Sequence, residues 1–305
     1  MANALFHKFK TISEFHKFRG LPKPEHPLIS VINLVDVETM PEGENSILLD
    51  FYSIALKRNF NAKIKYGQQE YDFDEGIMFF MSPGQIFRIQ VEKNLPLKHS
   101  GWMLLVHPDF LWNTPLAKIF KQSEFFDYSV NEALFLSEKE ENIVAAIMQN
   151  IQQEYHSNID KFTQQVMLAQ LELLLTYSER FYNRQFITRK IANHNVLNRL
   201  EDILKAYFED DNLGKKGLPT VHYIAETLNM SPNYLSNLLK VLTGQSTQQH
   251  IHDKLIEKAK EKLSVTDLSV SEIAYELGFE HPQSFSKLFK TKTNSSPLEF
   301  RASFN

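Results

Sequence analysis

The chain has 305 residues, of which 43% are hydrophobic and 23% charged, and its formal net charge is −4. This length allows two domains, and the composition is that of an ordinary globular protein. The negative charge argues against a generally basic protein that coats nucleic acid. The absence of cysteine excludes disulfides, thiolate zinc sites and cysteine nucleophiles. No apolar run approaches about 18 residues and the start lacks a secretory layout, so we expect a cytoplasmic protein without a membrane partner.

Residues 1–107 have the pattern of a β-rich domain. Their apolar segments are rich in β-branched and aromatic residues, and turn-forming stretches such as Pro41–Gly43 and Ser82–Gly84 separate them. The predicted strands are Leu28–Val35, Ile47–Leu56, Ala62–Tyr66, Ile77–Met81, Gln85–Val91 and Trp102–His107. Several short strands with turns between them are typical of a β-barrel or a β-sandwich.

Two amphipathic helices are predicted after Phe110. The first follows Ser137–Glu140, which has the form of a capping box. The second runs from about Lys161 to Tyr182 and carries two apolar stripes. These are Phe162, Val166, Ala169, Leu173 and Tyr177, and Met167, Leu171 and Leu174. One stripe can pack on the strands and leave the other for a second partner, or both can be buried within one domain.

The stretch from Arg184 to Asn195 breaks this periodicity and is basic. We predict residues 185–195 to be a linker between an N-terminal domain, residues 1–184, and a C-terminal domain, residues 196–305. The alternative, in which the preceding helix continues through this stretch, stays open.

A duplicated pattern lies within residues 220–301. Its first copy is Ile224–Ser246 and its second copy is Ile273–Ser296. The equivalent pairs include Ile224 and Ile273, Ala225 and Ala274, Leu228 and Leu277, Pro232 and Pro282, Leu238 and Leu288, and Lys240 and Lys290. The shared apolar register predicts two copies of one supersecondary unit.

Each copy has the order helix, tight turn, helix. The turn passes through Asn229 in the first copy and Gly278 in the second, and both residue types tolerate a positive φ. Pro232 and Pro282 then stand at the first position of the second helix, where the missing N–H costs nothing. This order predicts a helix-turn-helix unit, which places its second helix in the major groove of DNA.

The outward face of each second helix is predicted to carry polar and basic side chains. They are Asn233, Tyr234, Ser236, Asn237 and Lys240 in the first copy, and Gln283, Ser284, Lys287 and Lys290 in the second. Asn and Gln can pair with adenine, Ser with several base edges, and Lys with guanine or phosphate. Residues 231–247 and 281–298 contain no acid. One such helix would suggest only a solvated face, but two in the same register favour DNA binding.

A long helix over Gln248–Ser264 is predicted between the copies, because Ile251, Leu255, Ala259 and Leu263 recur at spacings of four. It would hold the two units on one face of the duplex, about 34 Å apart. Ser269–Glu272 has the form of a capping box that begins the second unit.

Residues 196–305 resemble the AraC/XylS family of transcription regulators. The resemblance is carried by Ile273–Phe279, Phe285–Lys290 and Pro297–Arg301, which follow the family's second-unit signature. It implies a multidomain α+β protein. A cupin-like N-terminal β-barrel with two flanking helices would serve effector binding or dimerisation, ahead of a seven-helix DNA-binding domain.

By position, the resemblance implies base reading by Asn233, Ser236, Asn237, His281, Gln283, Ser284 and Lys287, and phosphate contacts by Lys240 and Lys290. The chain departs from the family's pattern in three ways. The first unit has Asn where some members have Arg, so its sequence preference cannot be carried over. Leu255 stands where the family usually has a basic residue, and Asn294 stands where the first copy has Gly244.

Catalytic and metal-binding motifs are missing from the sequence. Residues 67–76 carry carboxylates without the His pair of metal-binding cupins, and His250 and His252 point to different faces of a helix. There is no glycine-rich phosphate loop, Gly-x-Ser-x-Gly elbow or His-Glu-x-x-His motif. We therefore expect no enzyme activity, no metal and no cofactor.

The sequence predicts a DNA-binding transcription regulator whose partners are double-stranded DNA, a small-molecule effector, a second copy of the chain and, if it is an activator, RNA polymerase. Two alternatives stay open. The N-terminal domain could be a catalytic cupin, or it could be a constitutive adaptor that dimerises and senses nothing.

Overall fold

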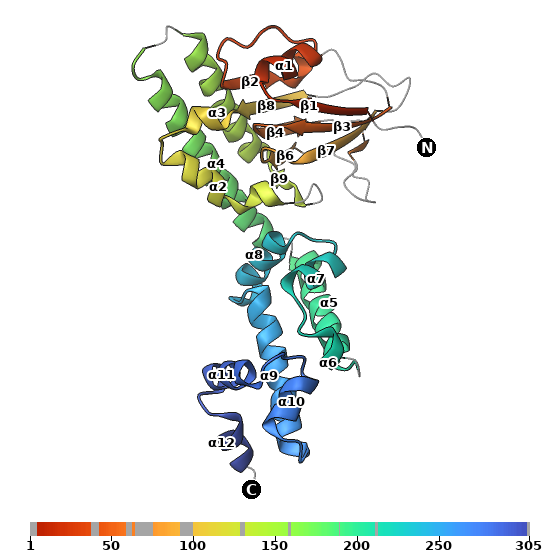
Figure 1. Ribbon diagram of the computed structural model, residues 1–305. Helices are drawn as coiled ribbons and strands as arrows, with labels where there is room; N and C mark the ends of the chain where they lie inside the picture. Colours follow the sequence, from red (N-terminus) through yellow and green to blue (C-terminus); the bar gives the residue numbers. More distant parts are fainter. Residues whose placement is uncertain are drawn as a thin grey trace. The chain divides into compact units, whose positions relative to one another are not determined.

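The computed structural model describes residues 5–37, 43–58, 63–64, 76–91, 100–128, 132–157, 160–188, 190–210 and 213–303. They belong to two compact units, Met1–Gln185 and Phe186–Asn305. Strands occur in the first unit, and the second is helical throughout its described part (Figure 1). None of the described helices combines the length and apolarity needed to cross a membrane.

The strands of the N-terminal unit form two sheets. The four-stranded sheet has the order β1 (Leu5–Phe9), β3 (Gly43–Leu49), β7 (Ile86–Val91) and β5 (Lys63–Ile64). The five-stranded sheet has the order β2 (Ile29–Asn33), β8 (Ser100–Val106), β4 (Tyr52–Arg58), β6 (Gly76–Met81) and β9 (Leu134–Leu136). All neighbours are antiparallel except β1 and β3. The described strands do not close into one barrel, so the expected cupin-like barrel is not found, and the sandwich alternative fits better.

Each of the six predicted strand segments overlaps at least one of these strands, and one segment is divided between two strands. The segment Ile47–Leu56 divides into β3 and β4 because the chain bends at Asp50 and Phe51. The Asp50 N–H donates to the Phe9 carbonyl oxygen at 3.0 Å, which fixes the bend against the end of β1. Most of Ala62–Tyr66 lies outside the described residues.

A helix inside the strand-rich region was not predicted. It is α1 (Ile12–Phe18), and a capping box of Thr11 and Glu14 begins it. Its apolar side chains belong to a core cluster that also contains residues from both sheets. The buried members of this cluster are Phe9, Ile12, Phe15, Ile32, Leu34, Val37, Ile47, Leu49, Phe51 and Leu105.

The second half of this unit is mainly helical, with β9 between η3 and α3. Its helices are η2 (Pro108–Leu111), α2 (Leu116–Gln122), η3 (Glu124–Asp127), α3 (Glu138–His156) and α4 (Thr163–Thr188), and a further short helix, η1 (Leu34–Asp36), comes before β3. The predicted capping box of Ser137 and Glu140 is confirmed at the start of α3.

The two stripes of α4 differ in exposure, as the first of the two interpretations expects. Met167, Leu171 and Leu174 are buried. On the other stripe, Phe162 is 53%, Val166 40% and Leu173 43% exposed. One face of α4 therefore packs within its own unit, and an apolar face remains accessible.

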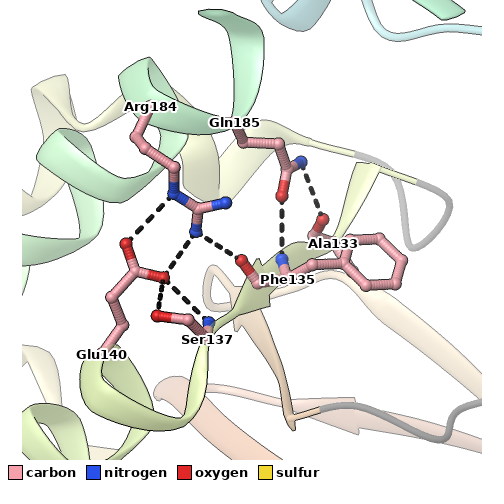
Figure 2. Close-up of polar contacts among 6 residues, drawn as sticks. All are labelled: Ala133, Phe135, Ser137, Glu140, Arg184 and Gln185. Atoms are coloured by element: carbon pink, nitrogen blue, oxygen red, sulfur yellow. Dashed lines mark hydrogen bonds and ion pairs between the residues drawn. The ribbon is translucent and has the colours of Figure 1, made fainter. Parts of the chain in front are cut away.

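The segment predicted to be a linker is helical in its described part. Helix α4 runs to Thr188, and α5 begins at Lys190. Arg184 and Gln185 hold α4 against β9 (Figure 2): the Gln185 amide accepts from the Phe135 N–H at 2.8 Å and donates to the Ala133 carbonyl at 3.2 Å. β9 is the edge strand of its sheet. The Gln185 side chain therefore makes hydrogen bonds with backbone groups at this edge, where otherwise another strand could pair.

In the C-terminal unit, α5 (Lys190–Phe208) is followed by several short helices and the longer α9. They are α6 (Leu213–Lys216), α7 (Val221–Thr227), α8 (Pro232–Thr243), α9 (Thr247–Val265), α10 (Val270–Glu276), α11 (Pro282–Thr293) and α12 (Pro297–Ala302). The predicted connecting helix is confirmed as α9, and its four apolar positions at spacings of four are all buried.

Candidate nucleic-acid interface

The first helix-turn-helix unit is formed by α7 and α8. Asn229, in the turn, has φ 56°, which confirms the positive φ expected there. Ser231 caps α8, since its Oγ accepts from the Tyr234 N–H at 3.3 Å, and Pro232 occupies the first helical position. Local residue types therefore place the turn and the start of α8.

The second unit, α10 and α11, repeats this geometry. The capping box of Ser269 and Glu272 begins α10, as predicted. Gly278 has φ 86° in the turn, and a Cβ there would lie 2.8 Å from the carbonyl carbon of Gly217. This turn therefore needs glycine for both its backbone conformation and its close contact.

The two second helices end in the same way. Gly244 after α8 has φ 76°, and Asn294 after α11 has φ 60°. Asparagine is the residue that most readily replaces glycine in this left-handed conformation. Asn294, where the first copy has Gly244, therefore allows α11 to end in the same conformation as α8.

Helix α11 exposes the polar face that the sequence predicts. His281, Gln283, Ser284, Lys287 and Lys290 are all exposed. On α8, Lys240 is exposed, whereas Asn233, Ser236 and Asn237 are partly exposed. No acidic residue lies on either helix. Both helices thus present amide, hydroxyl and ammonium groups to the surroundings without a carboxylate among them.

Tyr234 corrects the predicted face of α8. It is only 8% exposed, and its ring centroid is 5.1 Å from that of Phe186 within the same unit. Tyr234 precedes the buried Leu238 by four residues, so both lie on one side of the helix. That spacing was the signal that assigns Tyr234 to the core.

Ser236 also has a structural contact. Its Oγ and the Oγ1 of buried Thr247, the first residue of α9, share a hydrogen bond of 3.0 Å. No local pattern marks this contact, because the two residues are eleven positions apart across the end of α8. Ser236 therefore helps to set α8 on α9.

Helix α9 contacts the second helix of each helix-turn-helix unit. From α8, Thr243 shares a 2.9 Å hydrogen bond with the Nε2 of His250, whose pKa is lowered mainly by burial. From α11, the Lys292 ammonium is 2.8 Å from the Asp253 carboxylate. With 19 residues, α9 is about 28 Å long. One rigid element thus supports both polar helices.

Lys292 and Asp253 were not predicted as partners. Lys292 belongs to the acid-free segment after His281, and Asp253 lies 39 residues earlier on α9. A pairing at this separation leaves no mark in local sequence. The pair uses Lys292 to join α11 to α9.

Among the described residues, no group of three His, Cys, Asp or Glu side chains is placed so that it could hold a metal ion. His250 and His252 instead bond to Thr243 and to Gln248, with Nε2 distances of 2.9 and 2.8 Å. The carboxylates of residues 70–75 lie outside the described residues.

Comparisons with known proteins concern mainly this unit. Residues 224–303 match a family model described as a helix-turn-helix domain. Over 93 residues the chain is 39% identical to YesN, an uncharacterized transcriptional regulatory protein of Bacillus subtilis (strain 168), and covers 25% of that protein and 30% of its own length.

Two solved structures are similar over about a third of the chain. The C-terminal domain of the two-component response regulator yesN from Fusobacterium nucleatum is 30% identical, with 35% of this chain and 98% of that chain covered and a TM-score of 0.31. The DNA-binding domain of AdpA, solved in complex with a target DNA, is 26% identical, with 34% and 91% covered and a TM-score of 0.30.

The turn geometry and the family match define the class of this unit, a helix-turn-helix domain of the DNA-binding kind. Within that class the domain is of the AraC type, which confirms the resemblance to the AraC/XylS family. The chain spans about a quarter of the Bacillus relative, so the likeness extends to the domain and not to the whole of that protein.

Proposed function

We propose that this protein is a transcription regulator that binds a specific double-stranded DNA sequence through α8 and α11. The proposal depends on one observation, the pair of helices α8 and α11 that contain no acidic residue. Each follows a turn with a positive φ, and both contact α9. Helices of this kind read base edges in the major groove, and their basic residues contact phosphates.

The proposed contacts divide between bases and phosphates. Base contacts are assigned to Asn233, Ser236, Asn237, His281, Gln283, Ser284 and Lys287, and phosphate contacts to Lys240 and Lys290. Tyr234 is withdrawn from this set because it is buried.

Genome-wide mapping of bound DNA, followed by fluorescence anisotropy with the recovered fragments, tests the proposal. Specific binding at physiological salt should be tighter than binding to scrambled fragments by about 10³-fold or more. Equal binding to both fragments would contradict sequence-specific regulation.

We further propose that the N-terminal unit provides dimerisation. The exposed apolar stripe recurs at spacings of four and three residues, from Phe162, just before α4, through Val166 and Ala169 to Leu173 on the helix. This is the spacing of a coiled-coil seam, and its natural occupant is the same face of a second copy of the chain.

A small-molecule effector is the second proposed role of this unit, and RNA polymerase is the further partner if the protein activates transcription. An effector can act only by binding two states of the protein unequally. Two rival functions predict different observations: a catalytic cupin would contain stoichiometric iron, manganese or zinc, and a constitutive adaptor would dimerise without being stabilised by any small molecule.

A further inference from the structure

One carboxylate, that of Asp253 on α9, accepts a hydrogen bond from each helix-turn-helix unit. Gln245, which follows α8, donates from its Nε2 to the Asp253 Oδ2 at 2.8 Å. Lys292, in the last turn of α11, donates from its Nζ to the Asp253 Oδ1 at 2.8 Å. Because α8 and α11 both lie beside α9 (Figure 1), this carboxylate joins the ends of the two polar helices.

The Asp253 carboxylate is ionised at neutral pH. Partial burial acts to raise its pKa, but the hydrogen bonds from Lys292 and Gln245 outweigh burial and hold this pKa below its ordinary value of 3.8. An ionised carboxylate accepts on both oxygens, so it can bond to the two donors at once. A bond between an ammonium and a carboxylate is also stronger than one between neutral groups.

The other acidic side chains of α9 are bonded differently. Glu257 is 2.9 Å from the ammonium of Lys254, and Glu261 is 3.0 Å from that of Lys258. Both of these lysines belong to α9 itself. Among the three acidic side chains of α9, all of which the structure describes, Asp253 is therefore the one that bonds to both helix-turn-helix units.

Ion pairs join α9 to the second unit at two places. Lys262, in the last turn of α9, is 2.6 Å from the Glu276 carboxylate of α10. Asp253 stands nine residues earlier, which is about 13 Å along the helix. Attachment at two points restricts rotation of the second unit on α9 more than attachment at one point does.

Such a rotation matters more for DNA binding than for the fold. The side chains of Lys292 and Asp253 are 27% and 43% exposed, and ion pairs at this exposure contribute little to stability. Two units that enter successive turns of the major groove, about 34 Å apart, must however match the DNA in both distance and rotation. A small rotation of α11 relative to α8 moves one of them out of register.

We propose that Asp253 is a positioning residue that fixes α11 relative to α8 and so restricts the protein to DNA sites with one spacing between their two parts. The inference rests on the proposed function, since spacing matters only if both helices contact DNA. It adds a source of specificity that contacts no base.

Anisotropy titrations of the full chain with three DNA fragments test the spacing. The fragments are a site recovered by genome-wide mapping, and the same site with one base pair inserted or removed between its two parts. One base pair moves the parts by about 3.4 Å and about 34°. The parent should prefer the original spacing, and Asp253→Ala should lower this preference about two- to fivefold. A parent without a spacing preference, or an Asp253→Ala protein that keeps it in full, would overturn the inference.

Matched variants separate positioning from a loss of charge or of stability. Glu257→Ala removes the same charge from α9, but its partner Lys254 lies on the same helix, so the spacing preference should stay. Gln245→Ala breaks the bond to the first unit without changing the charge, and it should lower the preference as Asp253→Ala does. The Tm of all three variants should stay close to that of the parent. A lowered Tm with equal weakening on all fragments would show a merely structural role and contradict the inference.

A distance measurement without DNA separates this inference from the proposed function. Because the chain has no cysteine, spin labels at Val241→Cys on α8 and Thr291→Cys on α11, both exposed positions, report only the distance between these helices. Electron–electron double resonance should give a wider distance distribution in Asp253→Ala than in the parent or in Glu257→Ala. A wider distribution in a protein that binds no specific DNA would contradict only the proposed function. An unchanged distribution in a protein that does bind specific DNA would contradict only the positioning role.

Discussion

Arg184 on α4 and Glu140 on α3 form a two-point ion pair. The Arg184 Nε and Nη2 donate to the two carboxylate oxygens at 3.0 and 2.7 Å, and Nη2 also reaches the Phe135 carbonyl oxygen of β9 at 2.7 Å (Figure 2). The same carboxylate accepts from the Ser137 N–H at 2.8 Å, which completes the capping box of α3. One acidic side chain therefore both begins α3 and joins it to α4.

Replacement of Arg184 should destabilise the N-terminal unit. Arg184→Ala leaves the half-buried Glu140 carboxylate without its cation, which we expect to lower the free energy of unfolding by about 1–3 kcal/mol. Urea unfolding followed by circular dichroism measures the change. Arg180→Ala, an exposed position on the same helix, should change it by less than about 0.5 kcal/mol. Equal effects of the two variants would show that the ion pair contributes nothing.

Gln283 and Lys290 on α11 should affect DNA binding in different ways. Gln283→Ala removes a proposed base contact and should relax specificity at one base pair by about 1–3 kcal/mol. Lys290→Ala removes a proposed phosphate contact, so it should weaken binding to all sequences and reduce the salt slope by about 1.

Anisotropy titrations at several salt concentrations, with matched and singly mutated sites, separate the two effects. Lys121→Ala in the N-terminal unit is the control for loss of one positive charge and should leave the slope unchanged. If both α11 variants bind like the parent, α11 does not contact DNA.

The C-terminal unit was predictable because its signals are local. Asn229 and Gly278 lie in the turns, Pro232 and Pro282 begin the second helices, and both turns have the expected positive φ. The duplication allowed each weak signal to be checked against its copy. Tyr234 lies on the buried side of α8 because it stands four residues before Leu238, and its polar hydroxyl does not change that position.

The N-terminal unit was less predictable because its contacts join distant residues. Gln185 bonds to β9 across about fifty positions, and β1 pairs in parallel with β3 forty residues later. The strand pattern alone could not distinguish a closed barrel from two sheets, since both use the same alternation. Nothing local marks Lys57 as buried, because a lysine near the end of a strand is usually solvated.

Gly278 should not tolerate a side chain. Gly278→Ala adds a Cβ at φ 86° that would lie 2.8 Å from the Gly217 carbonyl carbon, so we expect a loss of at least about 1–2 kcal/mol in unfolding free energy. Gly244→Asn is the matched control. Its Cβ would meet nothing within 4 Å, and Asn294 occupies the equivalent position in the second unit. Similar losses for the two variants in urea unfolding would contradict the role assigned to the Gly217 contact.

Lys57 should make stability depend on pH above neutrality. The folded protein releases this proton near pH 7, whereas the unfolded chain holds it until its ordinary pKa of 10.5. Between these values the unfolded state binds more protons, so stability should rise with pH, by at most about 1.4 kcal/mol per unit.

Urea unfolding at pH 7, 8 and 9 measures this slope. In Lys57→Met the Lys57 contribution should be absent and the protein should be more stable than the parent at pH 7. Burial keeps the pKa of His16 and His26 below its usual 6.5, so these histidines contribute little in this window. An identical slope in the parent and the variant would mean that Lys57 is charged in the folded protein.

Leu173 provides a test of the proposed dimer. It is 43% exposed on the stripe of α4 that begins at Phe162, so Leu173→Asp should leave the fold of the single chain intact. In a symmetric pair of α4 helices, however, it would place a carboxylate in an apolar seam, and we expect the dimer Kd to rise at least tenfold, or about 1.4 kcal/mol. Sedimentation velocity over a range of protein concentrations measures the change. Glu172→Ala, at the adjacent exposed position, should leave association unchanged. A parent protein that stays monomeric, or a Leu173→Asp protein that associates like the parent, would require another occupant for this face of α4.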